Sequence, residues 1–386
     1  MDIIALITKP SSLLGGIERS TLDICLSLAN RGHEVSLIYF EAGDLLEKYQ
    51  KFCRKILKVK NLDVNKKQLI PSTIKFIGNI LAVSQQLEIK EKKNTIIYVD
   101  HYNYCLFAAV LAWQNKLPSV FHLRISSLTK APRKHLLGMK LIKQIISVSN
   151  QTKLDWVNTG IQAEKISVVY NGINPDFFQP VPNLPEVRNK FNLAPEQKVI
   201  SYIGRIDQEK GIEILIKSLS LLCQENRTNI KLLIAGRPVI HSSREVGEKY
   251  QRSLQELVVN LGIESHVEFL GHVGKPELIY QVSDLTVIPS VYSEPFGRTV
   301  IESMSCGVPV LGSKIGGIPE ILTGEFARGL FTPGNSESLL IKLQEFLDWR
   351  VENPQLGERC RHHVINNFSL EKNVDGVEKV LLEAMK

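Results

Sequence analysis

The chain has 386 residues, of which 44% are hydrophobic and 7% aromatic. A single hydrophobic core stops growing at roughly 250 to 300 residues, so this length predicts two domains. The net charge of +7 comes from the first half, where residues 1–180 hold 24 Lys and Arg against 14 Asp and Glu. The six cysteines show no Cys-x-x-Cys spacing and no histidine at ligand distance, which argues against a structural zinc or a disulfide framework.

Hydrophobic runs are too short to suggest a membrane span. The best of them, Cys105–Trp113, has about half of the ~18 to 20 residues that such a helix needs. At the N-terminus, a short apolar run before Lys9 and Pro10 fits a buried strand and is too short for the usual layout of a signal peptide. These features predict a cytoplasmic protein.

Along the chain, short β-branched runs alternate with longer helical patterns, which is typical of βαβ units and a parallel sheet. A segment with four prolines, residues 174–191, breaks this rhythm and is predicted to be a linker. The expected strands are residues 3–8, 34–40, 95–100, 119–124, 145–150 and 166–172 before this segment, and residues 198–205, 231–236, 266–273, 284–290 and 309–313 after it. Two doubly wound domains facing a cleft would bind ligands beyond the carboxyl ends of their strands.

Two basic stretches in the first half raise the question of a membrane surface. Residues 44–60 predict an amphipathic helix, with apolar residues at helical spacing on one face and lysines on the other. Such a helix can lie on an anionic membrane, although an ordinary solvated helix explains the pattern equally well. The second stretch, Lys130–Lys143, favours membrane contact. Nucleic acid is not an expected partner, since neither stretch carries interleaved aromatic residues.

In the first domain, candidate site residues follow the expected strands. Gly15 and Gly16 lie after the first strand, where paired glycines allow a ligand to approach the backbone. The Gly-x-Gly-x-x-Gly pattern of dehydrogenases is absent. His122 lies near the end of the strand at residues 119–124, although a lone histidine in an apolar strand is more often a core residue.

Charged residues of the second domain predict a diphosphate site. Arg205 and Lys210 lie between the first strand and the first helix, and another helix is predicted to begin near Gly297. Both cations and exposed amides at a helix start favour phosphate. Glu294 and Glu302 are too far apart for a glycosidase pair, since eight helical residues span about 12 Å against roughly 5 to 9.5 Å in those enzymes. They suggest a clamp in which Glu302 binds ribose and Glu294 binds a sugar beyond the diphosphate.

Several motifs in this order resemble the retaining GT-B glycosyltransferases of family 4, over nearly the whole chain. They are GGIERSTLDICLSLANRGHEV, IISVSN, VVYNGIN, YIGRIDQEKGIEILIKSL, VEFLGHV, DLTVIPSVYSEPFGRTVIESMSCGVPVLGSKIGGIPEIL and GLFTPGN. The resemblance implies a GT-B fold with an acceptor-binding domain at residues 1–178 and a nucleotide-sugar-binding domain at residues 190–368. A C-terminal helix, about residues 369–386, would return to the first domain.

The resemblance also implies roles for individual residues. Arg205 and Lys210 look like the pyrophosphate-binding pair, aided by the backbone amides of Arg298 and Thr299. Glu302 resembles the ribose-binding residue. The resemblance further implies that Gly16 of the first domain approaches the donor and that the Val273 loop contacts the base. Glu294, Phe296 and Gly297 would lie at the donor sugar. His122 resembles the histidine at the reacting centre, with His101 as a competing candidate.

The activity implied is the metal-independent transfer of a hexose from a UDP- or GDP-linked sugar, with retention at the anomeric carbon and no cofactor. No side chain is an evident nucleophile or strong general base. The basic first domain suggests a glycan or lipid-linked acceptor in polysaccharide or envelope glycan assembly, in the cytoplasm or on the inner face of the membrane. Two alternatives stay open: a catalytically silent protein of the same fold, and a nucleotide-sugar epimerase.

Overall fold

The structure, a computed structural model, describes residues 1–11, 16–59, 69–89, 91–126, 133–181, 184–225, 229–238 and 244–386. The chain divides into two compact units, one of Met1–Gly172 with Leu370–Lys386 and one of Ile173–Ser369. The proline-rich segment at residues 174–191 lies within the second unit. Its helix α7 (Leu184–Asn189) contributes Val187 to a buried cluster with Val199 and Leu233, so this segment packs as part of the domain.

Within the described residues, the first unit has a parallel seven-stranded sheet of order β3-β2-β1-β4-β5-β6-β7. Its strands are β1 (Asp2–Ile7), β2 (Glu34–Tyr39), β3 (Lys55–Lys58), β4 (Thr95–Val99), β5 (Ser119–Leu123), β6 (Gln144–Ser147) and β7 (Ile166–Val168). Its helices are α1 (Gly16–Asn30), α2 (Leu46–Gln50), α3 (Leu69–Leu87), α4 (Cys105–Asn115), α5 (Arg133–Leu141), α6 (Asn150–Val157) and α16 (Leu370–Met385).

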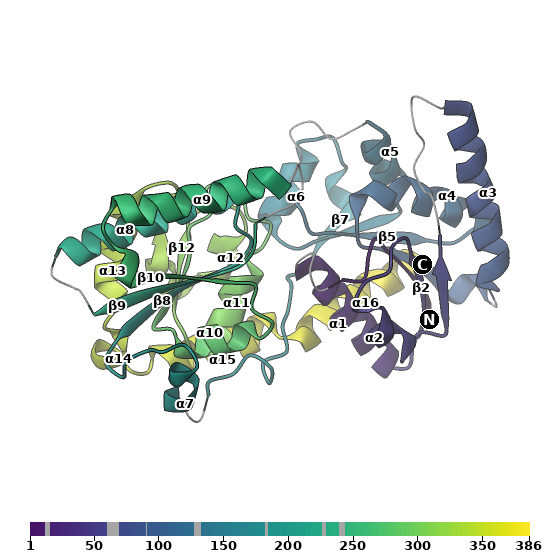
Figure 1. Ribbon diagram of the computed structural model, residues 1–386. Coiled ribbons are helices and arrows are strands. Elements are labelled where there is room, and N and C mark those ends of the chain that lie inside the picture. Colours follow the sequence, from purple (N-terminus) through teal and green to yellow (C-terminus); the bar gives the residue numbers. More distant parts are fainter. Residues whose placement is uncertain are drawn as a thin grey trace. The chain divides into compact units, whose positions relative to one another are not determined.

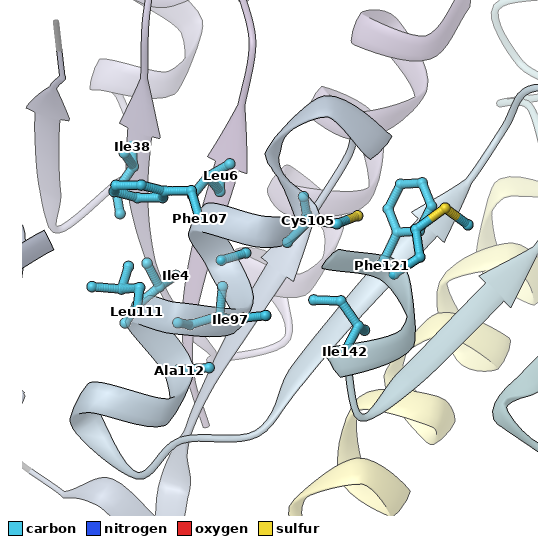
Figure 2. Close-up of a cluster of buried hydrophobic side chains, with 14 of the residues drawn as sticks. Ile4, Leu6, Ile38, Ile97, Cys105, Phe107, Leu111, Ala112, Phe121 and Ile142 are labelled. Atoms are coloured by element: carbon cyan, nitrogen blue, oxygen red, sulfur yellow. The ribbon is translucent and has the colours of Figure 1, made fainter. Parts of the chain in front are cut away.

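Hydrophobic clusters cover both faces of this sheet. On one face, Ile4, Ile38 and Ile97 of the strands pack against Phe107 and Leu111 of α4, as Figure 2 shows. On the other face, the C-terminal helix α16 lies beside α1, although they are at opposite ends of the sequence (Figure 1). Strands that are buried on both faces read as continuous apolar runs, which is why the sequence reveals them.

The predicted helix at residues 44–60 is wrong. The structure has only the five-residue helix α2 there, followed by strand β3, whose Lys55 and Ile56 pair with Ser36 and Leu37 of β2. Tyr49 is buried as expected for the apolar face. Pairing along the sheet edge outweighs the helical spacing of the apolar residues, so no basic amphipathic helix forms in residues 44–59, the part of this segment that the structure describes.

The second unit, within the described residues, has a parallel six-stranded sheet of order β10-β9-β8-β11-β12-β13. Its strands are β8 (Lys198–Ile203), β9 (Ile230–Ala235), β10 (Val267–Gly271), β11 (Leu285–Ile288), β12 (Val310–Ser313) and β13 (Leu330–Phe331). Besides α7, its helices are α8 (Ile212–Gln224), α9 (Arg244–Asn260), α10 (Pro276–Val282), α11 (Arg298–Ser305), α12 (Ile318–Ile321), α13 (Ser336–Phe346), α14 (Trp349–Glu352) and α15 (Leu356–Phe368).

Each unit is therefore a doubly wound α/β domain, as predicted. Every one of the expected strands is present, while β3 and the two-residue β13 were not predicted. Among the helices that the structure describes, none combines the length and apolar character that crossing a membrane requires.

Candidate functional site

The strand order places the charged residues of the second unit around one point. Strands β8 and β11 are neighbours in the sheet, and the chain winds away from them in opposite directions. Ligands of open α/β sheets bind at such a switch point, beyond the carboxyl ends of the strands. Arg205 and Lys210 follow β8, and Glu294 follows β11.

Lys210 and Glu294 form an ion pair at this point. The Lys210 ammonium donates a hydrogen bond to Oε2 of Glu294, and the two side chains are 18% and 20% exposed. Ser290 Oγ donates to the same carboxylate oxygen at 3.4 Å. Burial works to raise the pKa of Glu294, but the charge and hydrogen bond of Lys210, helped by Arg205 and Ser290, hold it below its ordinary value. Glu294 is therefore an ionised acceptor of hydrogen bonds.

The guanidinium of Arg205 is more open to solvent. Its side chain is 42% exposed, and Nη2 lies 3.4 Å from a carboxylate oxygen of Asp207. The main chain at Arg205 is fixed because the Tyr202 hydroxyl donates to its carbonyl oxygen at 2.5 Å. A planar cation on a fixed backbone can donate two hydrogen bonds to one phosphate.

The loops around the switch point pack closely against glycines that have no room for a side chain. Gly211 has φ +60°, and a Cβ there would lie 2.3 Å from the carbonyl oxygen of Pro289. Gly316 has φ +62°, and a Cβ there would lie 2.2 Å from the carbonyl oxygen of Glu294. Gly317 donates its amide to that same oxygen at 2.7 Å. The loops after β8, β11 and β12 thus fix the position of Glu294.

Helix α11 begins at Arg298, directly after Gly297, and the sequence predicted a helix start near Gly297. Gly297 has φ +102° and precedes the first turn, which contains Arg298 and Thr299. Its carbonyl accepts a hydrogen bond from the Val300 amide at 2.9 Å. The Phe296 ring is buried edge-on against Phe368, with 5.8 Å between ring centres. The Phe296 side chain therefore belongs to the core, and a contact from this residue to a ligand would have to use its main chain.

Glu302 is held by two neighbours. Its Oε1 accepts from Nε of Arg298 at 2.8 Å, and its Oε2 accepts from the Tyr280 hydroxyl at 2.9 Å. The residue is 9% exposed. Burial raises the pKa of Tyr280 well above its ordinary value, which keeps the hydroxyl a donor. The carboxylate is thus fixed near the start of α11 with further acceptor capacity on both oxygens.

The Val273 loop follows β10, and the Val273 side chain packs partly against the core of the second unit. The amide of Gly236, after β9, donates to the carbonyl of Gly271 at 2.8 Å. This hydrogen bond ties the loops after β9 and β10 at the same edge of the sheet. Val273 therefore lies on the sheet edge that carries Arg205.

In the first unit, the sequence candidates lie at different depths. Gly16 is exposed and opens α1, and Gly15 lies outside the described residues. His122 is fully buried, with Nδ1 at 2.6 Å from the Tyr98 hydroxyl and 3.0 Å from Nη2 of Arg124. Burial and then the charge of Arg124 lower its pKa well below the ordinary value, so the ring is neutral. Its Nε2 has no hydrogen-bond partner among the described atoms.

His101 is the more accessible of the two histidines. It follows β4 and is half-buried, and its Nδ1 accepts the amide of Asn103 at 3.3 Å. The ring stacks on Tyr102 with 4.7 Å between centres. The His122 side chain has no exposed surface and cannot contact a ligand in this arrangement. Of the two candidates, the geometry therefore favours His101. The role itself stays a prediction.

Four residues of the second-unit site had no assigned role in the sequence. Tyr280 binds Glu302, Ser290 binds Glu294, and Gly316 with Gly317 supports the Glu294 backbone. The sequence pattern could have indicated Gly316 and Gly317, since they follow the strand at residues 309–313 in the same way that Gly15 and Gly16 follow the first strand. Nothing in the sequence pattern marks Tyr280, which lies on a buried helix face.

Comparisons with known proteins identify the family of the chain. The family model "Glycosyl transferases group 1" matches residues 184–363, and "Glycosyltransferase Family 4" matches residues 14–177. An uncharacterized glycosyltransferase of Methanocaldococcus jannaschii, MJ1607, is 28% identical over 99% of both chains. The lipopolysaccharide 1,2-N-acetylglucosaminetransferase of Salmonella typhimurium is 30% identical over 55% of each.

Solved structures share the fold. Anabaena HepE, in a complex with UDP and glucose, superposes with a TM-score of 0.80 at 21% identity, covering 99% of this chain and 100% of that one. The two family models together span most of the sequence, one on each unit. The chain therefore belongs to the glycosyl transferases group 1, the GT-B glycosyltransferases of family 4.

Proposed function

We propose that the chain transfers a hexose from a nucleoside diphosphate sugar to a hydroxyl of a glycan or lipid-linked acceptor, with retention at the anomeric carbon and without a metal. The observation that carries this proposal is the cluster of Arg205, Lys210 and Glu294 at the switch point of the second sheet. It combines two cations for a diphosphate with an ionised carboxylate for sugar hydroxyls. The UDP and glucose bound to HepE support a uridine nucleotide as donor.

In the transfer, the bond between the anomeric carbon and the β-phosphate oxygen breaks. The acceptor hydroxyl oxygen forms the new bond to that carbon, and its proton passes to the departing diphosphate. Arg205 and Lys210 offset the charge that develops on the diphosphate, and such preorganised electrostatic stabilisation is usually the largest contribution to catalysis. Glu302 would bind the ribose hydroxyls and Glu294 the sugar hydroxyls. We expect the reaction to occur in the cytoplasm or at the inner face of the membrane, as a step of polysaccharide or envelope glycan assembly.

Nucleotide binding is the first test. We would measure thermal shifts with UDP, GDP, ADP and their hexose conjugates for the wild type, Lys210→Ala and Lys217→Ala. Lys217 is the matched control because it is exposed on α8, the helix that follows Lys210. We expect one nucleotide series to stabilise the wild type and Lys217→Ala, and Lys210→Ala to lose about tenfold or more in affinity. A wild type that responds to no nucleotide would overturn the proposal.

Product analysis then separates transfer from the alternatives. Incubation of the identified donor with candidate acceptors should release the nucleoside diphosphate and glycosylate the acceptor with the anomeric configuration of the donor. An epimerised donor formed without any acceptor would identify an epimerase instead. Donor binding with no turnover on a broad acceptor panel would favour a catalytically silent protein.

A further inference from the structure

One layer of helices on the first unit has an unusual outer surface. Helices α3, α4 and α5 cover the same face of the sheet, and Phe76, Leu111 and Met139 are their respective inward residues in one core cluster. The helices are in direct contact, since a Cβ on Gly138 of α5 would lie 2.3 Å from the Leu106 amide of α4. The Asn115 side chain of α4 donates to Ser84 of α3 at 2.8 Å. The three helices therefore form one continuous layer.

The outer side of this layer exposes large apolar side chains. Three lie on α3 with the spacing of one helical face, one lies in the last turn of α4, and two lie on α5. They are Ile74 (66% exposed), Ile77 (50%), Leu81 (47%), Trp113 (78%), Leu137 (52%) and Leu141 (56%). Single exposed hydrophobic residues are ordinary, but a group of this size on neighbouring helices marks an interaction surface.

The charges on the same layer have one sign. The sequences of α3, α4 and α5 contain no Asp or Glu. They do contain exposed cations, among them Lys75, Arg133 and Lys140. A partner that binds this layer must offer an apolar region to the exposed hydrophobic side chains and negative charges to the exposed cations.

We propose that the outer side of α3, α4 and α5 binds the surface of an anionic lipid bilayer. Trp, Leu and Ile enter the boundary between headgroups and acyl chains, and Lys and Arg remain among the anionic headgroups. A second copy of the chain, paired through the same face, would place these cations against their own equivalents, which disfavours it. This surface replaces residues 44–60 as the membrane-contacting region, and it goes beyond the proposed donor site, which lies in the other unit.

Vesicle sedimentation tests the proposal on the full chain. The wild type should bind vesicles of phosphatidylcholine with phosphatidylglycerol, bind vesicles of phosphatidylcholine alone more weakly, and dissociate as salt rises. Ile77→Ser with Leu81→Ser should weaken binding about tenfold or more, since two large apolar side chains are lost. Lys140→Glu should weaken it about fivefold or more, given the usual contribution of one cation near an anionic surface.

Matched controls have similar exposure elsewhere. Ile341→Ser removes a 59% exposed isoleucine from α13, and Lys48→Glu with Lys51→Glu reverses two exposed lysines of residues 44–60. Both should bind vesicles as the wild type does. All of the variants should keep wild-type nucleotide binding, which distinguishes failure of this proposal from failure of the proposed function.

Two results would overturn the membrane surface. The first is a wild type that does not bind anionic vesicles, and the second is a control that loses as much binding as Ile77→Ser with Leu81→Ser. If the first result comes with self-association in sedimentation velocity, and these two substitutions abolish that association, the layer is an interface between copies of the chain.

Discussion

The Lys210 ammonium and the Glu294 carboxylate are in direct contact although 84 positions separate them in the sequence. Glu294 thereby orients the ammonium at the switch point of the second sheet. An ammonium group has three donors, so Lys210 can bind Glu294 and a phosphate oxygen together. The pair therefore joins the expected sugar end of the site to the expected diphosphate end. Substitution of Glu294 and substitution of Lys210 should affect different steps.

Glu294→Gln should impair transfer while nucleotide binding remains. The amide cannot supply an ionised acceptor to the sugar hydroxyls, and the Lys210 charge loses its competing carboxylate. We expect the transfer rate to fall about 100-fold, with UDP affinity unchanged or higher. Calorimetry with UDP and a transfer assay with the identified donor measure the two effects. Loss of UDP affinity comparable to that of Lys210→Ala would contradict the assignment of Glu294 to the sugar.

Tyr280→Phe should loosen Glu302. The substitution removes the 2.9 Å hydrogen bond to Oε2 and leaves the carboxylate with the hydrogen bond from Arg298 to Oε1. We expect a loss of about 1 to 2 kcal/mol in the free energy of unfolding, because Oε2 of the buried Glu302 loses its hydrogen bond from Tyr280. If Glu302 binds ribose, the variant should also lose several-fold affinity for UDP and none for inorganic pyrophosphate, which lacks the sugar. Equal losses for both ligands would place Glu302 outside the ribose site.

Gly316→Ala should disturb the backbone that carries Glu294. The change strains a residue with φ +62° and places a Cβ 2.2 Å from the Glu294 carbonyl oxygen. Gly324 is the matched control, with φ +58° and no atom within 4 Å of a Cβ. We expect Gly324→Ala to cost about 1 to 2 kcal/mol in unfolding free energy, the strain alone. Gly316→Ala should cost more and should also lower transfer activity, which chemical unfolding and the transfer assay would show. Equal costs and full activity would show that the loop moves aside freely.

Buried parallel strands were the most predictable part of the fold. Residues 96–99 are all hydrophobic and buried because both sheet faces are covered, and this pattern can be read without knowing which helices cover the strand. Strand β3 was missed since its half-buried residues at the sheet edge also fit helical spacing. Pairing with β2 is a long-range contact that local periodicity does not contain.

The candidate site was predictable where chemistry and strand order coincide. Arg205, Lys210 and Glu294 follow strands and carry charge, so the topology predicts that they meet. His122 was a weaker case, because the sequence gives its strand but not its depth. Its burial depends on Tyr98 and Arg124, which reach it from β4 and from beyond the end of β5. Such side-chain networks depend on packing that no residue pattern records.

Asp100→Asn should change how the stability of the first unit depends on pH. Burial, and then the nearby Glu18, raise the pKa of Asp100 to about 8, although Arg124 and backbone amides act in the opposite direction. The folded state therefore holds a proton on Asp100 that the unfolded chain releases near pH 4. Since the folded state binds the extra proton between these two values, the wild type should lose stability as pH rises, by at most about 1.4 kcal/mol per pH unit. Asn mimics the protonated acid, so the variant should lose this part of the slope.

Urea unfolding at several pH values, followed by tryptophan fluorescence, measures the difference in unfolding free energy. Two parallel stability curves between about pH 5 and pH 8 would show that Asp100 is ionised in the folded protein.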